Sequence, residues 1–184
     1  LSFPDLYEPK EFEAGDKKPR YNASFLVVPD SENDKTIRAA MLAACVAKHG
    51  AVKGPKELAS YKLAHNKTCY ADGNTKDYDG YANMMAPSSH RRAQDGPVGV
   101  FGDVIDPATG KVVVLTALSG KPYAGCYVNA SVEFYVTEGK FPGIRCGLVG
   151  VQFAEEGDAF SGSKIASPDD FEPITGGADA DPLA

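Results

Sequence analysis

The stretch YVNASVEFYVTEGKFPGIRCGLVGVQF, residues 127–153, decides the fold class. Up to residue 136 its apolar side chains occupy every second position, which predicts a half-buried strand. A second apolar run begins at Ile144, and its parity switches between Leu148 and Val149. Such a switch within Gly147–Gly150 predicts a bulge or a strong bend, as a strand that curls around a small barrel requires. The inward positions of the first strand are Val128, Ala130, Val132, Phe134 and Val136.

On either side of this hairpin the chain offers further short strands and one helix. Residues 21–28 alternate in polarity and predict a strand that Pro29 stops. Asn33 or Asp34 is placed to cap a helix that runs to about His49, with Gly50 as its stop, and we expect no second helix. Residues 54–95 are rich in turn chemistry, so we expect long loops there around a strand at 81–88, followed by another within 97–106. Five or six short strands with one helix between early strands predict a mainly β protein built on a small barrel.

Composition restricts the class of protein. The chain has 184 residues, of which 43% are hydrophobic and 24% charged, and this balance excludes a collagen, a coiled coil and a wholly disordered protein. No apolar run approaches the ~18–20 residues that span a bilayer. The start shows no secretory signal, so we expect a cytoplasmic protein.

Charge divides the chain into two parts. Residues 1–166 hold 19 Lys and Arg against 20 Asp and Glu, a net charge of −1, whereas residues 167–184 hold five carboxylates and no basic residue. We therefore expect a globular domain over 1–166 and a flexible acidic tail over 167–184, of the kind that often binds partners. The tail residues proposed for such contacts are Asp169, Asp170, Phe171, Glu172, Asp179 and Asp181.

The usual signatures of catalysis are absent, including G-x-S-x-G, H-E-x-x-H and the Walker loop, so we expect no enzymatic activity. One pattern has the spacing of a metal site, because Cys45 and His49 form an i,i+4 pair and His65 and Cys69 form another. The competing interpretation is that Cys45 packs on a helix face, that His49 lies favourably at the helix C-terminus, and that His65 and Cys69 are loop residues with this spacing by chance. We favour the second interpretation and expect neither a metal nor a cofactor.

Aromatic and basic residues interleave between residues 61 and 92. Tyrosines there alternate with lysines, with the Arg91-Arg92 pair and with His65 and His90. Single-stranded nucleic acid is held by such a mixture, since cations follow the phosphates while rings stack on unpaired bases. The competing interpretation is that these tyrosines only cover loops of a β protein.

At these segments the chain resembles the OB-fold single-stranded DNA-binding proteins of tailed bacteriophages. The resemblance rests on the order and spacing of four stretches: LSFPDLYEPK at the start, RYNASFLVV before the helix, GCYVNASVEFY at 125–135 and GIRCGLVGVQFAEEGDAFSG at 143–162. It implies a five-stranded OB-fold-like barrel, a basic groove lined by aromatic rings and an acidic C-terminal tail. It also implies a protein in the host cytoplasm that coats and protects single-stranded DNA during phage DNA replication, recombination and repair. The tail would recruit phage or host replication and recombination proteins, although it ends in Leu183-Ala184 and not in an aromatic residue.

We predict binding without sequence preference, through stacking and electrostatics. The predicted stacking residues are Tyr61, Tyr70, Tyr78 and Tyr81, with Tyr7, Tyr123 and Tyr127 in reserve. The predicted phosphate contacts are Lys62, Lys67, Lys76, Arg91 and Arg92, supported by Lys10, Arg20, Lys121 and Arg145. Preference for DNA over RNA follows from the resemblance alone, because no residue pattern reads a 2′-hydroxyl.

Two alternatives from other classes stay open. A barrel of this kind can instead bind a protein or peptide along an edge strand. A metal-dependent enzyme built on Cys45, His49, His65 and Cys69 is the third hypothesis.

Overall fold

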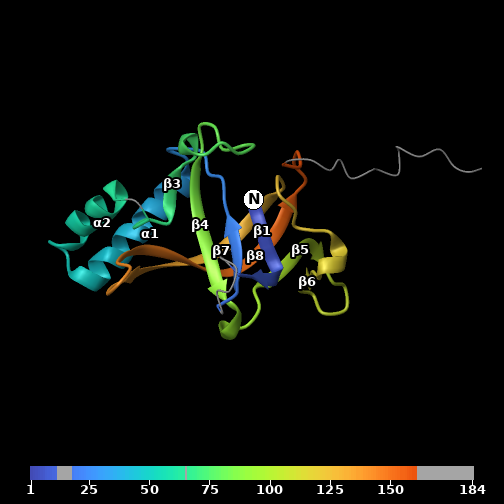
Figure 1. Ribbon diagram of the computed structural model, residues 1–184. Helices are drawn as coiled ribbons and strands as arrows, with labels where there is room; N and C mark the ends of the chain where they lie inside the picture. Colours follow the sequence, from blue (N-terminus) through green and yellow to red (C-terminus); the bar gives the residue numbers. More distant parts are fainter. Residues whose placement is uncertain (12–17, 65, 161–184) are drawn as a thin grey trace, which may run out of the picture.

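The computed structural model (Figure 1) describes residues 1–11, 18–64 and 66–160. This part of the chain contains two α-helices, eight strands and three short 3-10 helices. The α-helices are α1 (Glu32–His49) and α2 (Gly54–Leu63). The strands are β1 (Ser2–Lys10), β2 (Arg20–Ser24), β3 (Tyr70–Asp72), β4 (Met85–Arg92), β5 (Gly99–Ile105), β6 (Val112–Val114), β7 (Tyr127–Thr137) and β8 (Gly143–Glu155).

The strands form one curled, open sheet, which confirms a mainly β protein. Its order is β1-β2-β4-β8-β5-β6, with β3 paired to β4 and β7 paired to β8. Strand β8 is the centre of the sheet. Strand β7 pairs with it antiparallel along one of its edges. Strands β4 and β5 pair with it in parallel along its other edge, β4 near His90–Gly147 and β5 further along β8. Helices α1 and α2 lie at one end of the sheet and β6 lies at the opposite end (Figure 1). The described residues thus form an open sheet of eight strands in place of the barrel of five or six strands that was expected.

The bulge expected near Gly147–Gly150 is present. Ser131 of β7 lies opposite Gly150 of β8, whereas the next residue, Val132, lies opposite Leu148. Val149 therefore has no partner on β7, and the pairing shifts by one residue as in a β-bulge. This shift turns the buried parity of β8 from Ile144 and Leu148 to Val151 and Phe153.

Helix α1 confirms the predicted helix, but its cap differs from the prediction. The Ser31 hydroxyl accepts a hydrogen bond from the Asp34 N–H at 3.3 Å, so Ser31 is the N-cap and not Asn33 or Asp34. At the other end Gly50 adopts a φ of 83°, as a residue that stops a helix often does. The Asp34 carboxylate is used elsewhere, as the acceptor of the Asp30 N–H and of the Tyr70 hydroxyl.

The prediction of a single helix was wrong, since α2 follows α1 directly. Its buried residues, Gly54, Leu58 and Tyr61, have the i, i+4, i+7 spacing of one helix face, but the first is a glycine, so only two apolar side chains mark that face in the sequence. Proline in the first turn favours a helix start, and packing against α1 supplies the rest. The two helices approach so closely that a Cβ on Gly54 would lie 2.7 Å from the Cα of Val46.

Two buried clusters share β8. The larger one, with Leu6, Tyr21, Val100 and Leu148, lies under the curled sheet. The smaller one, with Met41, Cys45, Leu58, Tyr61, Tyr70 and Ile144, lies between the helices and the sheet.

Two strand boundaries differ from the sequence prediction. The strand expected over 21–28 ends at Ser24, with one further bridge at Val27. The strand expected over 81–88 begins only at Met85, because residues 73–84 form turns. No helix in the described part of the chain is long and apolar enough to cross a membrane.

Candidate nucleic-acid interface

The face of β2 and β4 that points away from the core is polar. The two strands pair antiparallel, and the facing pairs are Arg20 with Arg92, Asn22 with His90 and Ser24 with Ser88. The residues between them, Tyr21, Ala23 and Ser89, are buried. Because side chains alternate along a strand, the three pairs share one open face.

Strands β7 and β8 extend this face with a group that we call the arginine strip: Arg20, Arg92 and Arg145 around His90 and Tyr135. His90 lies opposite Gly147 of β8, and Tyr135 of β7 lies opposite Arg145. The Tyr135 hydroxyl lies 3.4 Å from His90 Nε2. Burial lowers the pKa of His90, and the charges of Arg20, Arg145 and Arg92 lower it further, so the ring is neutral near pH 7. Three guanidinium groups from three strands therefore gather around one uncharged imidazole.

The neighbouring arginines of β4 differ in role. Arg92 lies on the open face, where its Nε and Nη2 donate to the Asp95 carboxylate at 2.8 and 3.1 Å. Arg91 has the opposite parity, and its Nε donates to the Gly96 carbonyl at 2.8 Å while Nη2 donates to the Asp95 carbonyl. Arg91 thus holds the turn after β4, and we leave it out of the proposed phosphate contacts.

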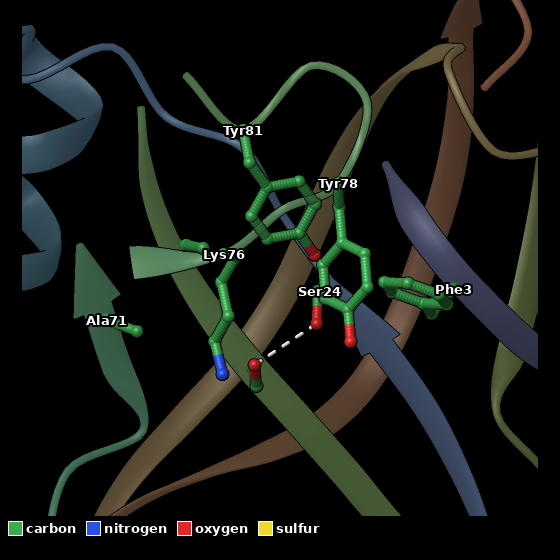
Figure 2. Close-up of a pocket in the computed structure, with 8 residues that line it drawn as sticks. Phe3, Ser24, Ala71, Lys76, Tyr78 and Tyr81 are labelled. Atoms are coloured by element: carbon green, nitrogen blue, oxygen red, sulfur yellow. Dashed lines mark hydrogen bonds between the residues drawn. The ribbon is translucent and has the colours of Figure 1, made fainter. Parts of the chain in front are cut away.

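A second group, the aromatic cluster, lies at the other end of β2 and β4 and consists of Phe3, Tyr78 and Tyr81 (Figure 2). The centroids of Phe3 and Tyr78 are 5.0 Å apart and those of Tyr78 and Tyr81 are 5.4 Å apart, both pairs edge to face. The cluster borders a groove of about 270 Å³. Its lining residues are Phe3, Ser24, Ala71, Lys76, Tyr78, Tyr81, Ala86 and Ser88.

The groove combines an aromatic side with a cation and a small polar floor. The Ser24 and Ser88 hydroxyls lie 3.1 Å apart, and Figure 2 shows Lys76 to one side of this pair and the Tyr78 and Phe3 rings to the other. Tyr78 is 54% exposed, whereas Tyr81 is only 3% exposed and supports it from behind. Because Ser24 and Ser88 belong to the same face as Arg20 and Arg92, the groove and the arginine strip form one continuous surface.

Three of the four predicted stacking residues are buried. Tyr81 lies behind Tyr78 at the groove, whereas Tyr61 and Tyr70 lie in the smaller core cluster. Tyr61 packs between α1 and α2 with its hydroxyl 3.3 Å from His49 Nε2. Tyr70 donates to the buried Asp34 carboxylate, and burial raises the pKa of its hydroxyl. Neither ring offers a face to a base, so we leave both out of the proposed stacking set.

The three reserve tyrosines lie outside the groove. Tyr7 donates to the Lys121 carbonyl, and Tyr123 donates to Glu156 at 2.6 Å. Tyr127 is 64% exposed at the start of β7. None of the three lines the groove beside Tyr78.

The predicted cations are dispersed over the molecule. Lys62 lies on α2, and the backbone of Lys67 pairs with Ile144 in the loop before β3. Lys10 is bound to Asp5 at 2.5 Å, and Lys121 contacts Glu156 and lies 4.3 Å from the centre of the Phe153 ring. The structure therefore brings together Arg20, Arg92, Arg145 and Lys76 along one surface and leaves the other lysines elsewhere.

The residues of the possible metal site do not form one in the described part of the chain. Cys45 is buried between the helices, and burial raises the pKa of the Cys69 thiol to about 12. His65 lies outside the described residues. Among residues 1–11, 18–64 and 66–160, no three His, Cys, Asp or Glu side chains are arranged to hold a metal ion.

Residue patterns alone did not identify Phe3, Asn22, Ser24, Ser88 and Tyr135 as part of this surface. The alternation of side chains along β2 and β7 could have placed Asn22, Ser24 and Tyr135 on the outward faces of their strands. That these faces join into one surface follows only from the pairing of β2 with β4 and of β7 with β8. The predicted tail contacts, Asp169, Asp170, Phe171, Glu172, Asp179 and Asp181, lie outside the described residues.

Comparison with known proteins identifies the family. The family model described as "Enterobacter phage Enc34, ssDNA-binding protein" matches residues 1–183. This chain belongs to that family. A curated relative, putative protein p50 of Acyrthosiphon pisum secondary endosymbiont phage 1, is 37% identical over 177 residues, which cover 95% of this chain and 90% of the relative.

Solved structures show the same fold. The single-stranded DNA-binding protein of bacteriophage Enc34, solved in complex with ssDNA, is 20% identical and superposes with a TM-score of 0.64 over 87% of this chain and 84% of that one. The gp2.5 single-stranded DNA-binding protein of bacteriophage T7 is 11% identical, with a TM-score of 0.52 over 97% of this chain and 93% of that one. The curled sheet is therefore shared well beyond sequence similarity.

Proposed function

We propose that this protein binds single-stranded DNA without sequence preference through the surface that joins the arginine strip to the aromatic cluster. The observation that carries the proposal is the continuity of that surface, with guanidinium groups at one end and an exposed ring beside a lysine at the other. Membership of an ssDNA-binding family and the ssDNA complex of the Enc34 protein support it.

Each part of the surface has a chemical task in this proposal. Arg20, Arg92, Arg145 and Lys76 contact phosphates, and such contacts carry no sequence information. Tyr78 stacks on an unpaired base while Tyr81 holds its ring in place from behind. A duplex keeps its bases stacked on one another, so it cannot use Tyr78 in this way.

We further propose that the protein coats and protects single strands exposed during phage DNA replication, recombination and repair, in the cytoplasm of the host cell. It acts without catalysis or a cofactor. The acidic residues 167–184 serve as a docking segment for replication or recombination proteins, because five carboxylates without a basic residue attract basic partner surfaces.

The decisive experiment titrates the full chain against fluorescent single-stranded DNA, duplex DNA and RNA of several lengths over a series of salt concentrations. Tight binding to single-stranded DNA with a steep loss of affinity as salt rises is the expected result, since each phosphate contact releases counterions. Tyr78→Ala should weaken binding by ~1–3 kcal/mol without changing the salt slope. Tyr127→Ala is the matched control, because this exposed tyrosine lies outside the groove. Equal affinity for single strands and duplex would contradict the proposal.

One observation favours a second function, binding of a protein along the sheet edge. Strand β6 ends the sheet, and its Val112, Val113 and Val114 are 38%, 36% and 67% exposed. An apolar edge strand of this kind can accept a further strand from a partner. Binding of that type would barely respond to salt, so the same titration separates it from phosphate binding.

A further inference from the structure

Phe3 has an unusual backbone conformation for its residue type. Its φ is 48°, in the left-handed region that side chains rarely adopt. The other non-glycine residues with positive φ in the described chain are Asp30, Asn66 and Asn83, which belong to the types that tolerate it. Phe3 has no such tolerance, and the proline that follows it restricts its backbone further.

A bulge in β1 creates this conformation. Ser2 lies opposite Ser24 and Asp5 lies opposite Asn22, so three steps along β1 correspond to two steps along β2. The extra residue falls within Phe3 and Pro4. Bulges of this kind redirect a side chain, and here the Phe3 ring lies against Tyr78 with a centroid distance of 5.0 Å.

Burial does not explain why the chain holds Phe3 there. The side chain stays 52% exposed, while its ring borders the groove with Lys76 on one side. On its other side is a hollow of about 570 Å³ lined by Asp5, Asp77 and Asp79 and by Lys10, which is bound to Asp5. The carboxylates of this hollow outnumber its one lysine, so it is less favourable for phosphates than the Lys76 side of the ring.

We infer that Phe3 is a base-stacking wedge at the end of the DNA path, held in place at a cost in folding stability. This inference rests on the proposed function. In this arrangement an unpaired base stacks on the exposed Phe3 ring, above the Ser24–Ser88 pair. The Tyr78 ring contacts Phe3 edge to face and holds it in place. The single-stranded DNA continues from there past Lys76. Strain of this kind is typical of functional positions.

The test compares three variants of the full chain for binding of oligo(dT) and for thermal unfolding. Phe3→Ala and Phe3→Gly should both weaken binding by roughly 5- to 150-fold, the loss of one base stack, with an unchanged salt slope. Phe3→Gly should melt at a higher temperature than Phe3→Ala, because only glycine adopts the left-handed backbone without strain. Phe3→Tyr keeps an aromatic face and should bind like the wild-type protein.

Phe141→Ala is the matched control, since Phe141 is 68% exposed in the turn between β7 and β8 and does not line the groove. It should leave affinity unchanged. Wild-type affinity in Phe3→Ala, or an equal loss in Phe3→Tyr, would overturn the wedge and leave the proposed function standing. Absence of binding by the wild-type protein would instead overturn the proposed function itself.

Discussion

Within the described part of the chain, His90 is the residue whose protonation we expect to respond to DNA. Burial lowers its pKa, as do Arg20 of β2, Arg145 of β8 and Arg92 of β4, while Tyr135 of β7 contacts its ring. A phosphate in the arginine strip would offset the three positive charges and raise the pKa again. Binding should therefore take up a proton, and affinity should rise as pH falls through the raised pKa of the complex toward the lowered pKa of the free protein, which lies below the ordinary value of 6.5.

His90→Gln should remove most of this pH dependence, measured by fluorescence anisotropy at constant ionic strength. His49→Gln is the control, because His49 contacts Tyr61 at the helical end of the molecule. If the wild-type protein and His90→Gln respond to pH in the same way, His90 does not bind a proton in the complex.

Asp34 is expected to control stability and not binding. Burial favours its protonated form, but the hydrogen bonds from Tyr70 and from the Asp30 N–H, with the charge of Arg38, outweigh burial and lower its pKa. A lowered pKa stabilises the fold above the unfolded value of 3.8, and this stability is lost as pH falls through the folded value.

Asp34→Ala should lower the free energy of unfolding by about 1–3 kcal/mol, because the buried Tyr70 hydroxyl loses its acceptor. Chemical denaturation measures the change, and ssDNA affinity below the melting temperature should stay as in the wild-type protein. Tyr70→Phe added to Asp34→Ala should recover part of the loss. A loss of affinity without a loss of stability would place Asp34 in the binding surface.

At the scale of elements, β4 and the turn after it assign different tasks to two neighbouring arginines. Arg92→Ala should weaken binding to all single strands and flatten the salt dependence by up to about 0.7 log units, the contribution of one phosphate contact. Arg91→Ala should instead lower the melting temperature, because its hydrogen bonds to Gly96 and Asp95 hold the turn.

Salt titrations and thermal unfolding of the two variants check this assignment side by side. Asp95→Asn is a useful third variant, since Asp95 neutralises Arg92 and its replacement should strengthen binding. An unchanged salt slope in Arg92→Ala would remove this residue from the interface.

At the scale of the whole molecule, the acidic C-terminal segment should compete with DNA. Residues 1–166 carry a net charge of −1, so the segment is attracted by the local arginine strip and not by overall charge. Because it belongs to the same chain, its effective concentration at the surface is high. Truncation after Ser167 should therefore raise ssDNA affinity, most at low salt, with a gain that fades as salt screens the charges.

A full-length variant separates the charge of the segment from its length. In this variant Asn or Gln replaces the five carboxylates, Asp169, Asp170, Glu172, Asp179 and Asp181. Its ssDNA affinity should match that of the truncated protein. Equal affinities of the full-length and truncated chains at low salt would end the competition hypothesis.

Local patterns were sufficient for part of the fold. The alternation in β7, except at the exposed Ala130, the bulge in β8 and helix α1 with its stop at Gly50 are confirmed, because each depends on neighbours within a few residues of one another. Helix α2 was missed because its stability comes from packing Leu58 and Tyr61 against α1, and a short weakly periodic segment carries no trace of that contact.

The sequence by itself determined the composition of the surface: tyrosines, arginines and a separate acidic segment in one chain. Only the tertiary structure decided which of them face the same way. Tyr61 and Tyr78 both belong to the stretch in which aromatic and basic residues interleave, but one packs under the helices and the other stands 54% exposed at the groove. Arg20, Arg92 and Arg145 lie far apart in the chain and meet because β2, β4 and β8 pair in a particular register. Strand pairing joins distant residues through backbone hydrogen bonds, and a shift of one residue would turn every side chain to the other face.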